Sequence, residues 1–126
     1  MPRETIYLDV VRHTNPVPMG AKIGNTLYSS GIQGGDPETG ILPEDIDVQA
    51  ANCFQNLREL LEKAAMTPDD IVHVAVFVKE DANRAKVNPP WLEMFPDENR
   101  RPARHQLVQP TLSFDIQLEI VAIKDR

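Results

Sequence analysis

An almost wholly apolar, β-branched run, IVHVAVFVK, extends from Ile71 to Lys79 and constrains the fold more than any other segment. Such a run is typical of a strand that other elements cover on both faces. One face is predicted to carry Val72, Val74, Val76 and Val78, and the other His73, Ala75 and Phe77. His73 is interpreted as a packed or partly hydrated side chain and not as a ligand. The chain must therefore supply cover for both sides of this strand.

A helical pattern between residues 46 and 64 offers cover for one side. Apolar residues recur there along one helix face: Ile46, Ala50, Cys53, Phe54, Leu57, Leu60, Leu61 and Ala64. Glu44, Asp45 and Asp47 lie at its start, where the helix dipole favours anions. We predict a long helix with one buried side. Cys53 lies in the buried stripe, so we interpret it as a small core residue and not as a nucleophile.

Three other segments are predicted to form strands. Thr5 to Val11 is apolar and β-branched, and Ala21 to Gly31 is typical of a hairpin that turns at Gly24 and Asn25. Ser113 to Lys124 alternates strictly. One face of this strand is predicted to carry Phe114, Ile116, Leu118, Ile120 and Ala122, and the other Asp115, Gln117 and Glu119.

A second helical region is predicted from Asp81 to Phe95. Pro89 and Pro90 cannot lie inside a continuous helix, so a new helix is expected to start at them, with Asn88 as a candidate cap. Trp91 is interpreted as a buried helix aromatic, with a pocket wall as the alternative. The order of elements indicates a small α+β domain with helices on one face of a mixed sheet.

The second face of this sheet is not simply polar. Ala75, Phe77, Val121 and Ile123 are predicted to lie on it among polar side chains. An open face of this kind is usually covered by a partner subunit. We therefore expect a homo-oligomer.

Length and charge narrow the class of protein. With 126 residues, the chain is predicted to be one domain, residues 1–126, that buries a core without metal or disulfide support. The net charge of −6 argues against nucleic acid as a partner, and no apolar run approaches the length of a membrane span. The start, MPRETIYLDV, lacks signal-peptide features and the single cysteine gives no internal disulfide, so a cytoplasmic location is expected.

Candidate chemistry concentrates near the end of the chain. No spacing of His13, His73 and His105 suits zinc, and no phosphate-binding loop or nucleophile elbow is present. The acidic chain nevertheless gathers positive charge in RRPARHQLVQ, residues 100–109, with Arg104 at the head of a predicted strand and Glu119 on the next. If these strands form a hairpin through residues 110–113, a structural salt bridge between Arg104 and Glu119 is the simplest interpretation. Arg100 and Arg101 are interpreted as solvated.

Several short motifs resemble, in order and spacing, the Rid family of reactive intermediate deaminases. They are SSG at 29–31, DPETG at 36–40, an N-x-x-x-L-L helix, VFV, VN at 87–88, RPAR at 101–104 and LEIVAI at 118–123. The resemblance covers nearly the whole chain from about Val11, and RPAR followed by L-E-I-x-A is its most specific part. It implies a chorismate-mutase-like fold (bacillus type). It also implies a homotrimer in which three sheets form a central barrel with ligand clefts between subunits.

The resemblance also implies an activity. Family members hydrolyse reactive enamines and imines to 2-oxo acids and ammonia, without a metal or other cofactor. Arg104 would hold the substrate carboxylate, because a planar guanidinium matches it with two parallel hydrogen bonds. Glu119 would activate water and transfer protons. Ser30, Gly31 and Asn88 would line the cleft.

Two positions depart from the family pattern. The best-known imine deaminases have a tyrosine where this chain has Val17, and many have a cysteine where it has Gln106. A buried amide needs partners, so Gln106 is expected to contact substrate and could indicate a second carboxylate. The alternatives to a general imine deaminase are therefore a deaminase of a catabolic diacid such as 2-aminomuconate, or a 2-oxo acid-binding regulatory protein without turnover. An RNA-cleaving activity is the weakest candidate because of the acidic charge.

Overall fold

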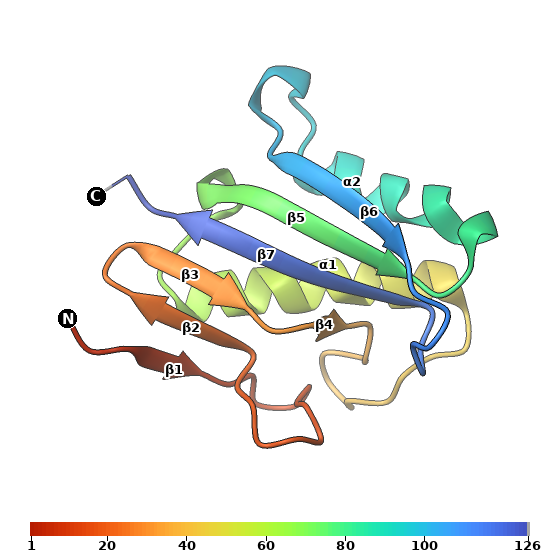
Figure 1. Cartoon of the computed structure of the whole chain (residues 1–126), viewed down its shortest axis with the longest axis horizontal. Helices are drawn as coiled ribbons and strands as arrows, with labels where there is room; N and C mark the ends of the chain where they lie inside the picture. The colour runs from red at the N-terminus through yellow and green to blue at the C-terminus, as the bar shows by residue number, and fades with distance from the viewer. Residues whose placement is uncertain (126) are drawn as a thin grey trace.

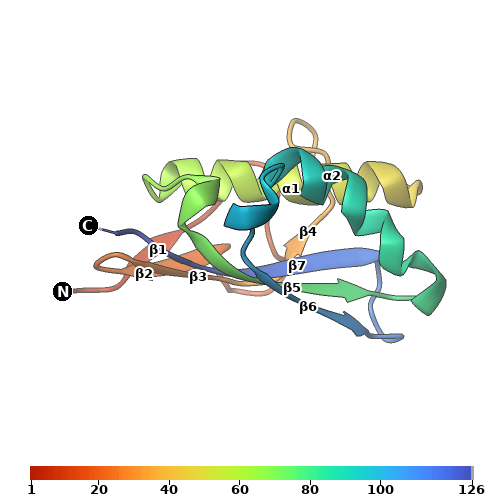
Figure 2. The ribbon, with the colours of Figure 1, turned by 90° about the horizontal axis from the view of Figure 1, so that it is seen from above.

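The computed structural model describes residues 1–125. In this part of the chain, one mixed sheet forms a layer, and helices α1 (Ile46–Lys63) and α2 (Asn88–Met94) cover one of its faces (Figure 1). The strands are β1 (Glu4–Ile6), β2 (Gly20–Ile23), β3 (Thr26–Ser29), β4 (Ile32–Gln33), β5 (Ile71–Val78), β6 (Ala103–Val108) and β7 (Ile116–Ile123). Short 3₁₀ helices are η1 (Pro68–Asp70), η2 (Asp81–Val87) and η3 (Glu98–Arg100). Figure 2 shows both helices on the same side of the sheet, which confirms the predicted α+β arrangement.

The strand order places β5 between the last two strands of the chain. The order is β1-β2-β3-β7-β5-β6, and β4 also pairs with β7. β5 is parallel to β6 and antiparallel to β7. The predicted hairpin of β6 and β7 through residues 110–113 is therefore wrong. Parallel pairing needs a crossover of a dozen or more residues, and the segment containing η2, α2 and η3 supplies it.

The core lies between α1 and the helix-facing side of the sheet. The predicted stripe is buried at all positions except Ile46, and the inward faces of β5 and β7 are fully buried against it. The Cys53 thiol donates to the carbonyl oxygens of Ile32 (3.6 Å) and Ile116 (3.8 Å). Burial raises the pKa of this thiol far above its ordinary value. Cys53 is thus a core residue, as predicted.

Two buried amides on α1, Gln49 and Asn56, fix the loop that follows β4. The sequence analysis gave Gln49 no role and included Asn56 only as the first residue of the N-x-x-x-L-L motif. Gln49 donates to the Pro43 carbonyl (2.8 Å) and to Asp115 Oδ2 (3.0 Å), and accepts from the Asp115 main-chain N–H (3.1 Å). Asn56 Nδ2 donates to two carbonyl oxygens of residues 33 and 35, each at 2.9 Å. Gly34 passes so close to α1 that a Cβ there would lie 2.4 Å from the Gln49 carbonyl oxygen. The loop therefore follows the helix closely.

The second sheet face is open in the single chain. Its exposed apolar side chains include Tyr28, Ile23 and Ile123, which are 62%, 52% and 44% exposed. Residues of β5 on this face pair with Gln117, Glu119 and Val121 of β7. The prediction of a partly apolar second face is confirmed. One position differs: Val72 is 45% exposed, because an irregularity between residues 71 and 73 shifts the register there.

The other elements follow the sequence with small changes of extent. β1 is shorter than the predicted strand at residues 5–11, whereas β2 and β3 form the predicted hairpin with Gly24 at a φ of +58°. The region from residue 81 divides into η2 and α2, as the prolines indicate. Within residues 1–125, no helix combines the length and apolar character needed to cross a membrane.

The C-terminus of α1 ends in an unusual left-handed residue. The Met66 N–H donates to the Leu61 carbonyl (2.8 Å) and the Ala65 N–H to the Glu62 carbonyl (3.0 Å), which is the Schellman pattern. Ala65 takes the position that glycine usually fills, with a φ of +58°. Lys22 and Lys124 donate to the carbonyl oxygens of residues 64 and 65 (2.7 and 2.8 Å) and so stabilise the negative end of the helix.

We expect Ala65→Gly to stabilise the protein by about 1 kcal/mol, because glycine removes the Cβ strain of the left-handed conformation. Urea-induced unfolding measures the change. The matched control is Ala51→Gly, at an exposed position inside α1, which should destabilise by about the same amount. Destabilisation by both substitutions would contradict this account of Ala65.

Candidate functional site

Arg104 points toward the helix layer from strand β6. Its register partner on β5 is Val74, which in turn pairs with Ile120 on β7, and both partners are fully buried in the core. Residues in register on neighbouring strands share a face of the sheet, and faces alternate along each strand. Arg104 therefore lies on the helix side of the edge strand, where its stem is partly buried.

Four contacts with uncharged groups hold the Arg104 guanidinium. Its Nη2 donates to Asn88 Oδ1 (2.9 Å), and its Nε and Nη2 donate to Gln106 Oε1 (3.1 and 2.8 Å). The ring of Trp91 lies beneath it, with 5.0 Å between the guanidinium carbon and the ring centroid. Desolvation lowers the pKa of Arg104, but an arginine remains charged at any physiological pH. The charge is thus fixed in place by neutral partners.

Glu119 lies on the opposite face of the sheet. It pairs with Ala75, the β5 residue that follows Val74, and its side chain is exposed on the open face. A one-residue offset along a strand reverses the face. Among the ion pairs within residues 1–125, none involves Arg104 or Glu119. The interpretation of these two residues as a structural salt bridge is therefore wrong.

Asn88 contributes its side chain to Arg104 and not to the helix terminus. The residue at the cap position of α2 is Val87, and no side chain caps that helix. The interpretation of Asn88 as a helix cap is wrong, because its Oδ1 accepts from Arg104 Nη2. Asn88 and Gln106 thus lie beside Arg104 as the predicted site requires. We call these three residues the arginine half-site.

Gln106 also anchors the arginine half-site to the crossover segment. Its Nε2 donates to the main-chain carbonyl of Arg84 in η2. Both ends of this amide are therefore bonded within the chain, which the sequence prediction of a substrate contact did not anticipate. Trp91 is 7% exposed, so it is a buried helix aromatic that also forms one wall beneath the guanidinium.

Ser30 and Gly31 lie beside Glu119. Tyr28 of β3 pairs with Val121 and Ile32 of β4 pairs with Leu118, so residues 29–31 face only residues 119 and 120 of β7. This two-against-three arrangement is a bulge, and Ser29 Oγ accepts from the Ile120 N–H (2.8 Å) within it. The sequence reasoning singled out Ser30 and missed Ser29, since nothing in the dipeptide SS distinguishes them. We call Ser30, Gly31 and Glu119 the glutamate half-site.

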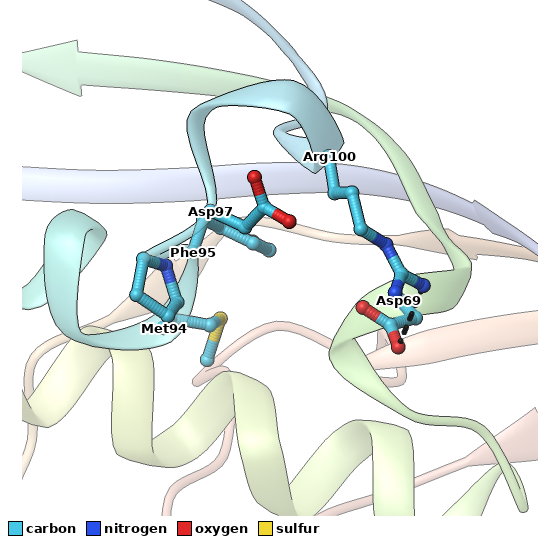
Figure 3. A pocket seen from close by; sticks show the side chains of 6 residues that line it. Asp69, Met94, Phe95, Asp97 and Arg100 are labelled. Atoms are coloured by element: carbon cyan, nitrogen blue, oxygen red, sulfur yellow. Dashed lines mark hydrogen bonds and ion pairs between the residues drawn. The ribbon is translucent and has the colours of Figure 1, made fainter.

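The other arginines of the basic segment have local partners. Arg100 pairs with Asp69 at 3.3 Å, and both side chains line a shallow hollow with Met94, Phe95, Pro96 and Asp97 (Figure 3). Arg101 Nε donates to the Phe95 carbonyl (2.9 Å) next to the end of α2. The prediction that both are exposed is confirmed, and their bonds are structural. The hollow in Figure 3 does not include Arg104.

Groups that could hold a metal ion do not occur among the residues that the structure describes. His13 Nε2 is buried without a hydrogen-bond partner, and burial lowers the pKa of this histidine. It is not in either half-site. The charged groups of the two half-sites are a guanidinium, a type of group that can bind an anion, and an exposed carboxylate, a type of group that can transfer protons.

Comparison with known proteins decides the family. The family model described as Endoribonuclease L-PSP matches residues 13–124. The chain belongs to this family, the YjgF/RidA or Rid family. A 2-iminobutanoate/2-iminopropanoate deaminase from Salmonella typhimurium is 34% identical over 112 residues, covering 88% of each chain. A RutC family protein from Haemophilus influenzae is 36% identical over 113 residues, covering 88% of this chain and 87% of that protein.

Solved structures of Rid proteins have the same fold. RidA from an Antarctic Psychrobacter species gives a TM-score of 0.88 at 27% identity, over 96% of this chain and 99% of that one. The YjgF gene product from E. coli gives 0.85 at 30% identity, over 96% and 98%. The family that the sequence motifs indicated is confirmed, and so is the predicted α+β arrangement of a mixed sheet with two helices, whereas the homotrimer and its central barrel stay predictions.

We expect Gly31→Ala to disturb the glutamate half-site, because the added methyl group would lie 2.4 Å from Cδ of Gln117. Because the nearest atoms belong to the amide end of a flexible side chain, Gln117 can turn aside, and the loss of stability should be no more than about 1 kcal/mol. Gln117→Ala in the same chain removes the obstacle and should recover most of the loss.

A double-mutant cycle by chemical unfolding measures this coupling. Strictly additive effects of Gly31→Ala and Gln117→Ala would show that the two residues do not compete for the same space.

Proposed function

We propose that this protein is a cofactor-independent hydrolase that converts small enamine and imine carboxylates to 2-oxo acids and ammonia. The observation that carries the proposal is the neutral environment of Arg104. Two amides and an indole ring hold its guanidinium, while no carboxylate of residues 1–125 pairs with it. A partly desolvated cation without an acidic partner is suited to bind the carboxylate of a ligand. The relatives named as imine deaminases support the reaction class.

The reaction needs one anion-binding group and one group that transfers protons. An enamine first tautomerises to its imine. Water then adds to the imine carbon, and the C–N bond breaks to leave the carbonyl and ammonia. In this proposal Arg104 holds the carboxylate, while Glu119 accepts a proton from the attacking water and returns one to the departing amine. A protonated imine is already electrophilic, so the proposed reaction uses no metal or organic cofactor.

The two half-sites support a site built between copies of the chain. Arg104 faces the helix layer and Glu119 the open face, so one chain does not present both to the same small ligand. A second chain placed over the open face could bring its own half-site to the first. We therefore propose a homotrimer of one-domain chains (residues 1–126), with their open faces around a central barrel and a ligand site at each junction. Its location in the cytoplasm stays a prediction.

The substrate is proposed to be a small monocarboxylate. The argument for a diacid rested on an unpartnered amide at Gln106, but this amide is bonded to Arg104 and to the Arg84 carbonyl. No further observation favours a 2-aminomuconate-like substrate. A regulatory protein that binds 2-oxo acids without turnover would use the same Arg104, so activity measurements distinguish it from the deaminase.

The ribonuclease description of the family model is not our proposal for this chain. RNA binding requires basic groups that are free to neutralise phosphates. Here the net charge is −6, and each arginine of the basic segment has partners in the chain. Salt-sensitive RNA binding would contradict this conclusion.

We expect Arg104→Ala to lower kcat/KM for imine hydrolysis by about two to four decades, since it removes the charge that holds the substrate. The assay follows loss of an imine generated in situ by an amino acid oxidase. Arg104→Lys keeps the charge without the planar geometry and should give an intermediate rate.

Arg100→Ala is the matched control for Arg104→Ala, because it removes an exposed cation from the same segment; it should retain wild-type activity. If Arg104→Ala kept more than about a tenth of the wild-type rate, the proposed role of Arg104 would be wrong. Wild-type protein that binds 2-oxobutanoate without accelerating imine loss would identify a binding protein instead.

A site shared between chains predicts complementation between two inactive variants. Arg104→Ala supplies an intact glutamate half-site, and Glu119→Gln an intact arginine half-site. In a cyclic trimer that contains both variants, one of the three junctions joins an intact Arg104 to an intact Glu119, so about a third of the wild-type sites should be restored. The variants are co-expressed with different tags, purified through both tags and assayed for imine hydrolysis.

Chains that each contain a complete site could not complement in this way. Mixed oligomers without activity would therefore contradict the shared site, even if each single variant is inactive as expected.

A further inference from the structure

The hydrogen bonds of Arg104 leave only part of its guanidinium free. A guanidinium has five N–H donors in a fixed plane, one on Nε and two on each Nη. Gln106 Oε1 accepts from both Nε and Nη2, so it occupies the edge of the plane between these two nitrogens. The remaining Nη2 hydrogen points toward the Nη1 side, where Asn88 Oδ1 accepts it. Both edges that could grip a carboxylate through two nitrogens are therefore already in use.

The orientation of Gln106 is fixed by chemistry on both sides of its amide. Its nitrogen donates to the Arg84 carbonyl, and its oxygen accepts from Arg104. A reversed amide would direct N–H groups at a cation and an oxygen at a carbonyl, so the network determines the assignment. The oxygen of Gln106 thus occupies the place of a carboxylate oxygen that would bind the Nε–Nη2 edge of Arg104.

The Nη1 nitrogen of Arg104 is the open end of the guanidinium. No hydrogen bond of residues 1–125 uses it. The buried side-chain nitrogen and oxygen atoms without a partner in this part of the chain are His13 Nε2 and Asn56 Oδ1. Because Nη1 is not one of them, it reaches solvent. A hydrogen bond from this nitrogen to a ligand would not have to replace one to the protein.

We infer that Gln106 is a specificity-determining residue that competes with the ligand for the Nε–Nη2 edge of Arg104 and directs a substrate carboxylate to Nη1. The inference rests on the proposed function, in which Arg104 holds that carboxylate. A carboxylate at Nη1 gains fewer charge-assisted hydrogen bonds than a bidentate pair, so it is held less tightly. The 2-oxo acid product carries the same carboxylate, and the same restriction lets it leave more readily.

Two substitutions at Gln106 test this competition in opposite directions. Gln106→Ser removes the oxygen from the Nε–Nη2 edge, and the dissociation constant for 2-oxobutanoate should fall about tenfold as that edge becomes available. Gln106→Glu has nearly the same shape but gives Arg104 a carboxylate partner of its own. It should raise the dissociation constant at least tenfold, with KM for the imine raised more than kcat is lowered.

The single tryptophan provides a readout in the intact protein. Trp91 lies beneath the guanidinium, so a carboxylate that binds Arg104 should change its fluorescence. Titration with sodium 2-oxobutanoate gives the dissociation constant, and Arg104→Ala should abolish the response. Gln106→Ala, which opens the same edge, replaces Gln106→Ser if the serine variant is unstable.

The outcomes separate this inference from the proposed function. Unchanged or weaker binding in the variants that open the edge would show that Gln106 supports Arg104 and does not compete with the ligand, which overturns the inference. Unchanged binding by Gln106→Glu would overturn it as well. In either case, loss of activity in Arg104→Ala would leave the proposed function intact. Full activity of Arg104→Ala would overturn the proposed function itself.

Discussion

The position of β5 between β6 and β7 determines where all the candidate groups lie. Both edges of this strand are paired, so the two strands that carry Arg104 and Glu119 cannot meet. In the sheet, Arg104 is the register partner of Val74, and Glu119 is the register partner of Ala75. Val74 and Ala75 are consecutive in β5, so their side chains and those of their partners face opposite sides of the sheet. The thickness of the sheet therefore separates Arg104 from Glu119. The proposed chemistry therefore requires more than one chain.

Much of the fold could be predicted because its signals are local. The stripe of α1, the alternation in β7 and the turn at Gly24 each follow from side-chain spacing within one segment. The partnership of β6 could not be predicted in this way. No local sequence motif indicates that two strands joined by a long crossover pair in parallel, whereas a short link such as residues 110–113 favours a hairpin.

The candidate site shows the same division between local and distant signals. The structure brings together Arg104, Asn88 and Gln106, which the sequence analysis had assigned to one site. Two expected partners were wrong: the cap role of Asn88 assumed a partner within its own helix, and the salt bridge to Glu119 assumed a hairpin of β6 and β7. The neutral surroundings of Arg104 depend on α2 and η2, which pack against the edge of β6. No short sequence motif predicts this packing.

The burial of Cys53 has a practical consequence for work with this protein. Its thiol is the only one in the chain, lies at 0% exposure and is held un-ionised by its surroundings. Thiol-directed alkylating reagents act on accessible thiolates, so they leave Cys53 of the native chain unmodified. Any cysteine engineered onto the surface would then be the one position open to maleimide dyes, spin labels or crosslinkers, with no need to remove the natural one.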